Sequence, residues 1–426
     1  KAKRTKWFKK AKFGMFIHWG LYTSAAGYWP PKNGQRYGQK YAEWIRHWGN
    51  VSEPEYGRLT KPLFKPAKGC TDEWAKLAKE AGMKYTVLTT KHHEGYTLFN
   101  AKTKYSKKNA ITGSTNISPK GRDLVAEYAD SVRKQGLKVG YYYSIIDWQH
   151  PHAVPESRKW PVQAGTDHSQ YVKYMHSHMK QLFKDYGKSD LLWVDYSSHR
   201  YQGSTWKTRK LLDELHKLQP HALVNNRFWG GLENSYGDFF TPEKYIPATG
   251  NNRTFEVCHT MNESFGFSAH DTHWKSTKDI VHMLVDIVSK GGNLLLNIGP
   301  DAKGHIPEES VVRLREVGKW LKVHGKAIYG AEANPFSKLN FDGRCTQKVL
   351  KKGDTNLYFH LLTWPEDGKI TLPDFPNNIL KVSLLGSKTK LKLKKTKDGM
   401  IIKLPKKALN EFCSIVKVRI RSTIKK

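Results

Sequence analysis

Short apolar runs typical of buried strands alternate with amphipathic helical stretches through the first 330 residues. The strand-like runs are FGMFIHWG (13–20), YTVLTTKHH (85–93), KVGYYYS (138–144), DLLWVDY (190–196), HALVNNR (221–227), FEVCHT (255–260) and GNLLLNIG (292–299). Helical periodicity marks residues 71–82, 121–136, 167–187, 205–218, 276–290 and 307–324. Because apolar strands that alternate with helices form parallel sheets covered on both faces, the pattern predicts a (β/α)8-like barrel, with room for an eighth strand. A doubly wound open sheet is the alternative.

From about residue 334 the pattern changes to short alternating strands with Gly, Pro and Asn-Asn turns between them. NLYFHLLTW, KITLPDF, ILKVSLLG and SIVKVRI are examples. This pattern predicts an antiparallel β-sandwich. We therefore expect two domains, a catalytic barrel at 1–333 and a β-sandwich at 334–426. Residues 386–408 are rich in lysine but keep the strand alternation, which is typical of a solvated strand face.

The composition fits a folded protein with a large core, because 38% of the residues are hydrophobic and 12% are aromatic. Lys and Arg number 72 against 38 Asp and Glu, which gives a net charge of +34. Residues 331–426 hold 21 basic and 8 acidic residues, so a net +13 lies there and +21 lies in the rest of the chain. The candidate polyanions are nucleic acid, an anionic membrane and a sulfated or uronic polysaccharide. A charge spread along the whole chain favours a protein surrounded by a polyanionic substrate or cell surface over one with a basic nucleic-acid arm.

The four cysteines, Cys70, Cys258, Cys345 and Cys413, have no zinc-finger spacing. Cys345 and Cys413 both fall in the second domain and are candidates for a disulfide. No apolar stretch is long enough to span a membrane. The chain begins with Lys, so we interpret it as a mature form whose export signal has been removed, and expect a secreted or periplasmic protein. The sequence predicts no oligomeric state.

Polar residues stand where each predicted barrel strand ends. The strand ends carry His18, then His92 and His93, Tyr143, Asp195, Arg227, His259 and Asn297. In a parallel barrel the carboxyl ends of the strands surround the active site, so seven polar ends together indicate a catalytic mouth.

Several kinds of chemistry are disfavoured at that mouth. Neighbouring residues on a strand point to opposite sides, so His92 and His93 suit one shared metal ion only if the strand has already ended. No HExxH or GxSxG sequence is present, nor a GxGxxG after the first strand or a GxxxxGK[ST] phosphate loop. These absences disfavour a metal ion, a Ser or Cys nucleophile and a bound nucleotide.

Carboxylate chemistry remains. Asp195 follows a buried strand in LLWVDY, although an Asp in that place also serves as a helix N-cap. Glu243 in GDFFTPEKY and Glu256 in RTFEVCHT are the candidates for a second carboxylate. A glycosidase needs two such groups, one that attacks the anomeric carbon and one that transfers protons. Neutral histidines suit the binding of sugar hydroxyls, because each ring offers a donor and an acceptor.

These stretches resemble glycoside hydrolase family 29, the α-L-fucosidases, over residues 5–335. The resemblance is carried by FGMFIHWGLY, AGMKYTVLTTKHHEGYTLF, GRDLVAEY, LKVGYYYS, DLLWVDY, FGF near 265–267 and VSKGGNLLLNIGPDAKGHIP. It implies a barrel followed by a β-sandwich, and a retaining, exo-acting enzyme without metal or cofactor.

The resemblance also implies roles for individual residues. Asp195 is then the nucleophile and Glu243 the acid/base, with Glu256 as the second candidate. The substrate-binding residues it implies are His18, Glu43, Trp44, His92, His93, Tyr143, Trp193, Arg227 and Phe265. We expect Glu94 to be structural rather than catalytic.

The sequence also departs from the family pattern. HWGLYTSAAGYWPPKNGQRYG is an aromatic, basic insertion, and Tyr196 stands after the nucleophile in place of a glycine. With the high charge, this predicts an α-L-fucosidase that acts on a sulfated, algal-type polysaccharide or its oligosaccharides. An α-L-galactosidase acting on a sulfated galactan such as porphyran, and a non-catalytic carbohydrate-binding homologue, are the alternatives.

Overall fold

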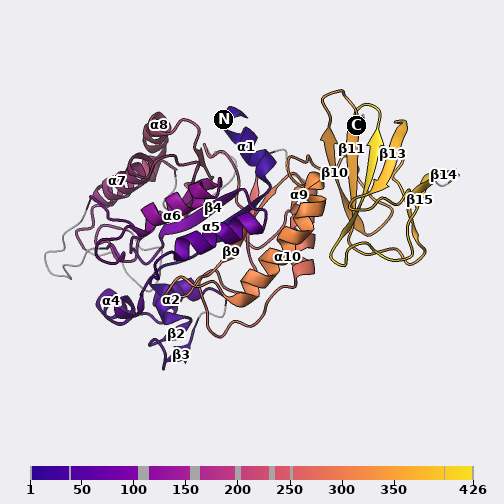
Figure 1. The fold of residues 1–426 in the computed structure, drawn as a ribbon. Helices are drawn as coiled ribbons and strands as arrows, with labels where there is room; N and C mark the ends of the chain where they lie inside the picture. Colours follow the sequence, from indigo (N-terminus) through magenta and orange to yellow (C-terminus); the bar gives the residue numbers. More distant parts are fainter. Residues whose placement is uncertain are drawn as a thin grey trace.

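The structure is a computed structural model, and it describes residues 2–37, 40–103, 115–153, 164–196, 203–229, 236–249, 253–397 and 399–424. Figure 1 shows two parts, a sheet surrounded by helices and a smaller all-β domain that lies against helices α9 (Thr277–Ser289) and α10 (Glu308–His324). The predicted fold class is confirmed.

A parallel sheet of seven strands forms the centre of the first part, in the order β7-β6-β5-β4-β1-β9-β8. The strands are β1 (Phe13–Ile17), β4 (Tyr85–Lys91), β5 (Lys138–Ser144), β6 (Leu191–Asp195), β7 (Leu223–Val224), β8 (Glu256–Thr260) and β9 (Asn293–Ile298). All seven fall within the predicted runs. Nearly every residue of these strands is buried, because helices cover one face of the sheet and the barrel interior fills the other.

Residues 238–244 occupy the eighth position of the ring, between the two edge strands β7 and β8. Single parallel bridges join Asn225 to Phe239, Phe240 to Phe255, and Glu243 to Cys258. Pro242 lies in this segment and its carbonyl accepts a hydrogen bond from Cys258 N at 3.0 Å. Because proline has no N–H to donate, the pairing here consists of isolated bridges. The ring thereby carries Glu243 to the same end as the other strand ends.

Helices follow the strands and cover the outside of the ring (Figure 1). They are α5 (Cys70–Glu80), α6 (Leu124–Lys134), α7 (His168–Asp185), α8 (Thr208–Leu218), α9 and α10, close to the six predicted ranges. Asp123 caps α6 by accepting hydrogen bonds from Val125 N and Ala126 N, and Ser276 caps α9 with a capping box.

The barrel interior has its own apolar cluster, built from one face of each strand. Phe16, Val87, Tyr142, Trp193 and Leu295 belong to it. Helix α1 (Ala2–Ala11) contributes Phe8 and Ala11 to the same cluster, although half of its residues, in the sequence AKRTKWFKKA, are basic. The interior is therefore filled below the strand ends, and the open space lies above them.

Short elements after β1 build one side of that open end. They are α2 (Tyr22–Ala25), the two-stranded β2 (Tyr28–Trp29) and β3 (Gln35–Arg36), η1 (Ala42–Trp44), α3 (Ile45–Trp48), α4 (Glu53–Thr60) and η2 (Lys61–Leu63). A further turn, η3 (Gly203–Trp206), precedes α8.

The second domain begins with β10 (Gly343–Val349), after η4 (Gly325–Ala327) has ended the barrel. One sheet has the order β10-β11-β16-β13, with β11 (Thr355–Leu361), β13 (Ile379–Leu384) and β16 (Ser414–Ile420); the other has the order β12-β15-β14, with β12 (Lys369–Thr371), β14 (Lys392–Thr396) and β15 (Gly399–Lys403). Trp320 of α10 donates its indole N–H to Cys413 O at 2.9 Å, which joins the two domains.

The possible disulfide between Cys345 and Cys413 is absent. Both are buried free thiols. Cys345 packs in the core of the second domain, whereas Cys413 packs in the larger core that extends from the barrel.

Candidate active site

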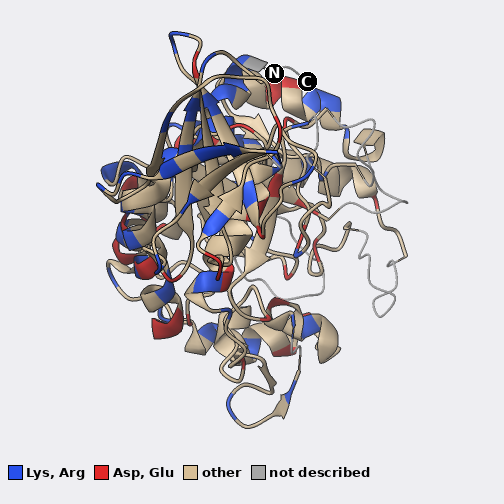
Figure 2. Ribbon diagram, turned by 90° about the vertical axis from the view of Figure 1, so that its right-hand side faces the viewer, with Lys and Arg blue, Asp and Glu red and all other residues tan. Residues whose placement is uncertain are grey.

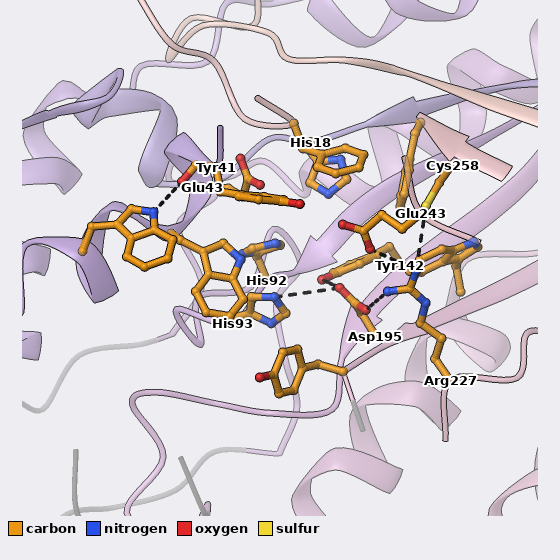
Figure 3. Close-up of a pocket in the computed structure, with 16 residues that line it drawn as sticks. His18, Tyr41, Glu43, His92, His93, Tyr142, Asp195, Arg227, Glu243 and Cys258 are labelled. Atoms are coloured by element: carbon orange, nitrogen blue, oxygen red, sulfur yellow. Dashed lines mark hydrogen bonds and ion pairs between the residues drawn. The ribbon is translucent and has the colours of Figure 1, made fainter. Parts of the chain in front are cut away.

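A cavity of about 310 Å³ opens at the carboxyl ends of the barrel strands (Figure 3). It brings together ten of the residues singled out from the sequence, namely His18, Glu43, Trp44, His92, His93, Trp193, Asp195, Arg227, Glu243 and Phe265. The segments that supply them lie up to 247 positions apart in the chain, and the barrel topology places them in one pocket.

Arg227 joins the two carboxylates of the pocket. Its Nη1 donates to Asp195 Oδ1 at 2.7 Å, and its Nη2 donates to Glu243 Oε2 at 3.0 Å, as Figure 3 shows. The guanidinium also lies over the Trp193 ring, 4.6 Å from the ring centroid. Burial alone would lower the pKa of Arg227, but Asp195 and Glu243 outweigh it and raise that pKa. The cation is therefore permanent, and it holds both carboxylates at one place.

Tyr142, and not the predicted Tyr143, faces the pocket. Side chains alternate along β5, so Tyr142 points into the barrel and its hydroxyl donates to Asp195 Oδ2 at 2.7 Å. Tyr143 points outward, where its hydroxyl lies 3.1 Å from Nδ1 of His178 on α7. The structure thus corrects the predicted tyrosine by one residue. Burial and the neighbouring carboxylate raise the pKa of Tyr142 well above 10, so it remains a donor.

Glu256, the second acid/base candidate, lies below the pocket and does not line it. Its side chain is fully buried near the start of β8, where Trp193 Nε1 donates to Oε1 at 3.0 Å and the Tyr85 hydroxyl donates to Oε2. Both oxygens are therefore used inside the barrel. The structure corrects this prediction, because a general acid must reach the bond that breaks.

We predict that Glu256 makes stability depend on pH. Burial raises the pKa of Glu256 from 4.5 to about 8. Between about pH 4.5 and 8 the folded protein therefore keeps a proton on Glu256 that the unfolded chain has lost. The free energy of unfolding falls as the pH rises through this window. We expect Glu256→Gln to flatten the decline of the thermal midpoint over that range in scanning calorimetry. An unchanged slope would show that Glu256 is already ionised in the folded protein.

His92 and His93 both line the pocket because β4 ends at Lys91, immediately before them. The Nδ1 of His93 lies 2.7 Å from Ser144 Oγ, and that hydroxyl in turn donates to Ile146 O at 3.0 Å. Ser144 therefore accepts from His93, which places the proton of His93 on Nδ1 and leaves Nε2 as an acceptor. Nε2 lies 3.8 Å from Asp195 Oδ2.

The ring proton of His18 is also fixed by a neighbouring side chain. Asn297 donates its Nδ2 to Phe265 O at 2.7 Å, so its Oδ1 accepts from His18 Nδ1, also at 2.7 Å. Burial lowers the pKa of His18 to about 3 and that of His93 well below its usual value. Two neutral imidazoles therefore present lone pairs to the cavity, an arrangement that accepts hydrogen bonds from hydroxyl groups.

An acid and an aromatic wall complete the pocket opposite Asp195. Glu43 accepts from Gly266 N at 2.8 Å and from Ser264 Oγ at 3.2 Å, and burial raises its pKa to about 7. The Phe265 ring lies 4.7 Å from the His18 ring and 6.3 Å from the Phe16 ring, between centroids. The pocket thus combines one apolar wall with many hydrogen-bonding groups, as the binding of a deoxy-sugar requires.

Glu94, for which we expect a structural role, does not line the pocket. It is buried, and its carboxylate accepts from Leu21 N at 3.0 Å and from the Tyr56 hydroxyl. It thereby anchors the loop that follows β1 to the end of β4.

Sequence reasoning missed six residues that line the pocket, namely Phe16, Tyr41, Trp48, Tyr142, Tyr196 and Cys258. Alternation along β1, β5, β6 and β8 could have found Phe16, Tyr142 and Cys258, because they share the inner face with Trp193. Tyr196 has a φ of 66°, the left-handed region that favours glycine, directly after Asp195. Backbone strain of this kind is common beside functional groups.

Within the described ranges, no group of three or more His, Cys, Asp or Glu side chains is placed to hold a metal ion. None of the helices described is long and apolar enough to cross a membrane.

Comparison with known proteins identifies the family. Residues 1–326 match the α-L-fucosidase family, and residues 344–418 match the α-L-fucosidase C-terminal domain. The chain is 30% identical to an α-L-fucosidase of Dictyostelium discoideum over 95% of this chain and 90% of that protein. It is also 30% identical to the human tissue α-L-fucosidase, over 94% of this chain and 84% of that protein.

Solved structures agree. Isoenzyme 1 of the Paenibacillus thiaminolyticus α-L-fucosidase superimposes with a TM-score of 0.85 at 35% identity, covering 99% of both chains. A family 29 α-L-fucosidase from Bacteroides thetaiotaomicron, trapped as a covalent intermediate with 2-fluoro-fucosyl fluoride, superimposes with a TM-score of 0.84 at 26% identity, covering 99% of this chain and 96% of that one. The chain therefore belongs to glycoside hydrolase family 29, the α-L-fucosidases, and it is a glycoside hydrolase.

Proposed function

We propose that the protein is a retaining, exo-acting α-L-fucosidase in which Asp195 is the nucleophile and Glu243 is the acid/base. The observation that carries this proposal is the convergence of both carboxylates on Arg227 at the mouth of the pocket. The Bacteroides homologue that was trapped as a covalent fucosyl intermediate supports a covalent route for this chain as well.

Asp195 is suited to attack because both of its oxygens are oriented. Arg227 holds Oδ1, Tyr142 holds Oδ2, and the side chain is only 14% exposed. In the first step a carboxylate oxygen bonds to the anomeric carbon while the glycosidic bond breaks, and Glu243 gives its proton to the leaving oxygen. In the second step Glu243 takes a proton from water, whose oxygen displaces Asp195 and yields free sugar and free carboxylate.

Glu243 is suited to proton transfer because it lies nearer the solvent. Its side chain is 32% exposed, and one oxygen is bound by Arg227 at 3.0 Å. A leaving group departs through the mouth, and water enters there. An acid/base at the mouth therefore meets both.

We predict that Tyr142 and Tyr143 differ sharply when each loses its hydroxyl. Tyr142→Phe removes a hydrogen bond to the carboxylate of Asp195, and such bonds contribute about 1.5–3 kcal/mol. We expect kcat/KM for an aryl α-L-fucoside to fall by roughly 10-fold to 100-fold. The matched variant Tyr143→Phe loses a contact with His178 and lowers stability, but kcat/KM stays within about threefold of the wild type. Equal losses of activity in the two variants would contradict this assignment.

Fucose rather than L-galactose is the sugar we propose for the pocket. Fucose lacks the hydroxyl that L-galactose carries on C6, and Phe265 and Phe16 form an apolar wall. An apolar wall discriminates against an added hydroxyl by about 10²-fold at most. We therefore expect an aryl α-L-fucoside to be turned over faster than the matching α-L-galactoside, by no more than that factor.

The net charge of +34 supports an anionic polysaccharide, or its oligosaccharides, as the natural substrate. Such polymers lie outside the cell, so a secreted or periplasmic location is part of the proposal. The decisive comparison is hydrolysis of a sulfated fuco-oligosaccharide and of a neutral aryl fucoside at low and high ionic strength. We expect salt to lower kcat/KM for the sulfated substrate and to leave that for the neutral one unchanged. The same salt response for both would refute the anionic substrate, and no turnover of either would favour a non-catalytic carbohydrate-binding homologue.

A further inference from the structure

Three lysines form one row across the small sheet of the second domain. In the β12-β15-β14 sheet, Lys369 of β12 pairs with Lys403 of β15, and Lys403 pairs with Lys392 of β14. Residues that pair directly across antiparallel strands point to the same face, with Cβ atoms about 5 Å apart. Lys394 lies two residues beyond Lys392 and therefore points to this face as well. We call these four residues the lysine face.

The lysine face is the outer side of the sheet. Its opposite side carries Ile370 and Ile402, which are buried in the core of the domain, and Leu393, which packs against that core. All four lysines are exposed.

The row of three lysines destabilises the folded sheet. Like charges directly opposite on neighbouring strands are destabilising. Within the described part of the chain, Asp367 is the one acidic side chain in an ion pair with the lysine face, and it lies 3.7 Å from Lys369. The three lysines of the row therefore do not stabilise the sheet, and their presence needs another explanation.

The surroundings are basic as well. Residues 386–408 contain nine lysines and one acidic residue. In Figure 2 the second domain faces the viewer, and Lys and Arg cover more of its strands than Asp and Glu do. A dense array of fixed ammonium groups attracts polymers with closely spaced negative charges and releases their counterions.

We infer that the lysine face binds an anionic polysaccharide, one whose sulfate or carboxylate groups meet the ammonium groups across the three strands. Lysine suits this task because its compact, hydrated charge sits on a flexible stem and adapts to irregularly placed anions. This inference rests on the proposed function for the choice of polymer.

The face suits a polysaccharide better than a nucleic acid. The other described strand residues on this side of the sheet, Thr371, Ile401, Thr396 and Gly399, include no aromatic ring. Proteins that bind single-stranded nucleic acid combine positive charge with aromatic side chains on which the bases stack. A charged face without such rings recognises charge density alone.

Such a face raises the local concentration of substrate ends at the active site. The second domain is fixed to α9 and α10 of the barrel, through the Trp320 contact and through the Arg344–Asp286 ion pair. A polymer held by one domain therefore presents its chain ends to the other at a high effective concentration.

The test compares two triple variants of the full chain that lose the same charge. Lys369→Gln/Lys392→Gln/Lys403→Gln removes the row. Lys173→Gln/Lys184→Gln/Lys217→Gln removes three exposed lysines from helices α7 and α8 as a control. Binding to fucoidan, a sulfated fucan, to its desulfated form and to single-stranded oligothymidylate is measured by titration calorimetry at several salt concentrations.

We expect the row variant to bind fucoidan at least about 10-fold more weakly at low salt, and the slope of log affinity against log salt to shrink by about 2. The affinity of the control stays within about threefold of that of the wild type. The desulfated polymer, whose chain ends bind only in the active site, binds to all three proteins with the same affinity. The thermal midpoint of the row variant stays equal to or above that of the wild type, because repulsion has been removed.

Three outcomes would overturn the inference. If both triple variants lost the same affinity for fucoidan, the binding would depend on net charge and not on the lysine face. If the wild type bound oligothymidylate as tightly as fucoidan, the lysine face would be a nucleic-acid site. A lower thermal midpoint would give the row a structural role. Turnover of an aryl α-L-fucoside by the wild type is measured in parallel, so that a failure of the proposed catalytic function is distinguished from a failure of polymer binding.

Discussion

Replacing Asp195 with glycine is expected to lower kcat for an aryl α-L-fucoside by about 10⁴-fold, since no carboxylate remains to form the covalent intermediate. The pocket is otherwise preserved, because Arg227 keeps its ion pair with Glu243 and its contact with the Trp193 ring. The measurement is steady-state release of the aryl alcohol by the purified variant.

Added azide distinguishes a lost nucleophile from a damaged site. In Asp195→Gly, azide occupies the vacated space, attacks the anomeric carbon directly and restores release of the aryl alcohol. A single displacement inverts the configuration, so the product is β-L-fucosyl azide. Activity within about 10-fold of the wild type, or no response to azide, would remove Asp195 from the nucleophile's role.

Replacing Glu243 with alanine has an effect that depends on the leaving group. For a substrate with a poor leaving group we expect kcat to fall by about 10²–10⁴-fold, because the departing oxygen receives no proton. For an activated aryl fucoside the first step survives and the intermediate accumulates. Azide then reacts with the intermediate by a second displacement and gives α-L-fucosyl azide.

Glu256→Gln is the matched control for Glu243→Ala. Glu256 is buried beneath the pocket, with Trp193 and Tyr85 as its partners, so its replacement changes stability more than turnover. If Glu256→Gln lowered kcat in a way that depends on the leaving group, and Glu243→Ala kept the kcat of the wild type, Glu256 rather than Glu243 would be the acid/base.

Much of the barrel was predictable because its strands are buried on both faces. The run 138–144 corresponds to β5, whereas the run 221–227 contains only a two-residue strand, β7. Two features escaped prediction for physical reasons. Residues 238–244 contain a proline and make only single bridges, so they carry no strand pattern. Helix α1 buries Phe8 within a basic sequence, and its burial depends on the barrel that it closes.

The candidate site was predictable where a residue ends a strand, because the carboxyl ends of parallel strands meet at one place. Asp195, His18 and Arg227 were found in this way. The tyrosine was misplaced because Tyr141, Tyr142 and Tyr143 are consecutive, and only the strand register decides which one faces inward. The protons on His93 and His18 depend on Ser144 and Asn297, whose contacts come from distant segments, and no local pattern reveals them.

The central claim is that Asp195 forms a covalent bond to the sugar, and one measurement tests it directly. The wild-type protein is incubated with 2-deoxy-2-fluoro-L-fucosyl fluoride, digested, and mapped by mass spectrometry. We predict one added fluorofucosyl group, attached to Asp195 in the peptide that contains LLWVDY. A label on any other residue, or release of fluoride with no label on the protein while turnover continues, would contradict the account.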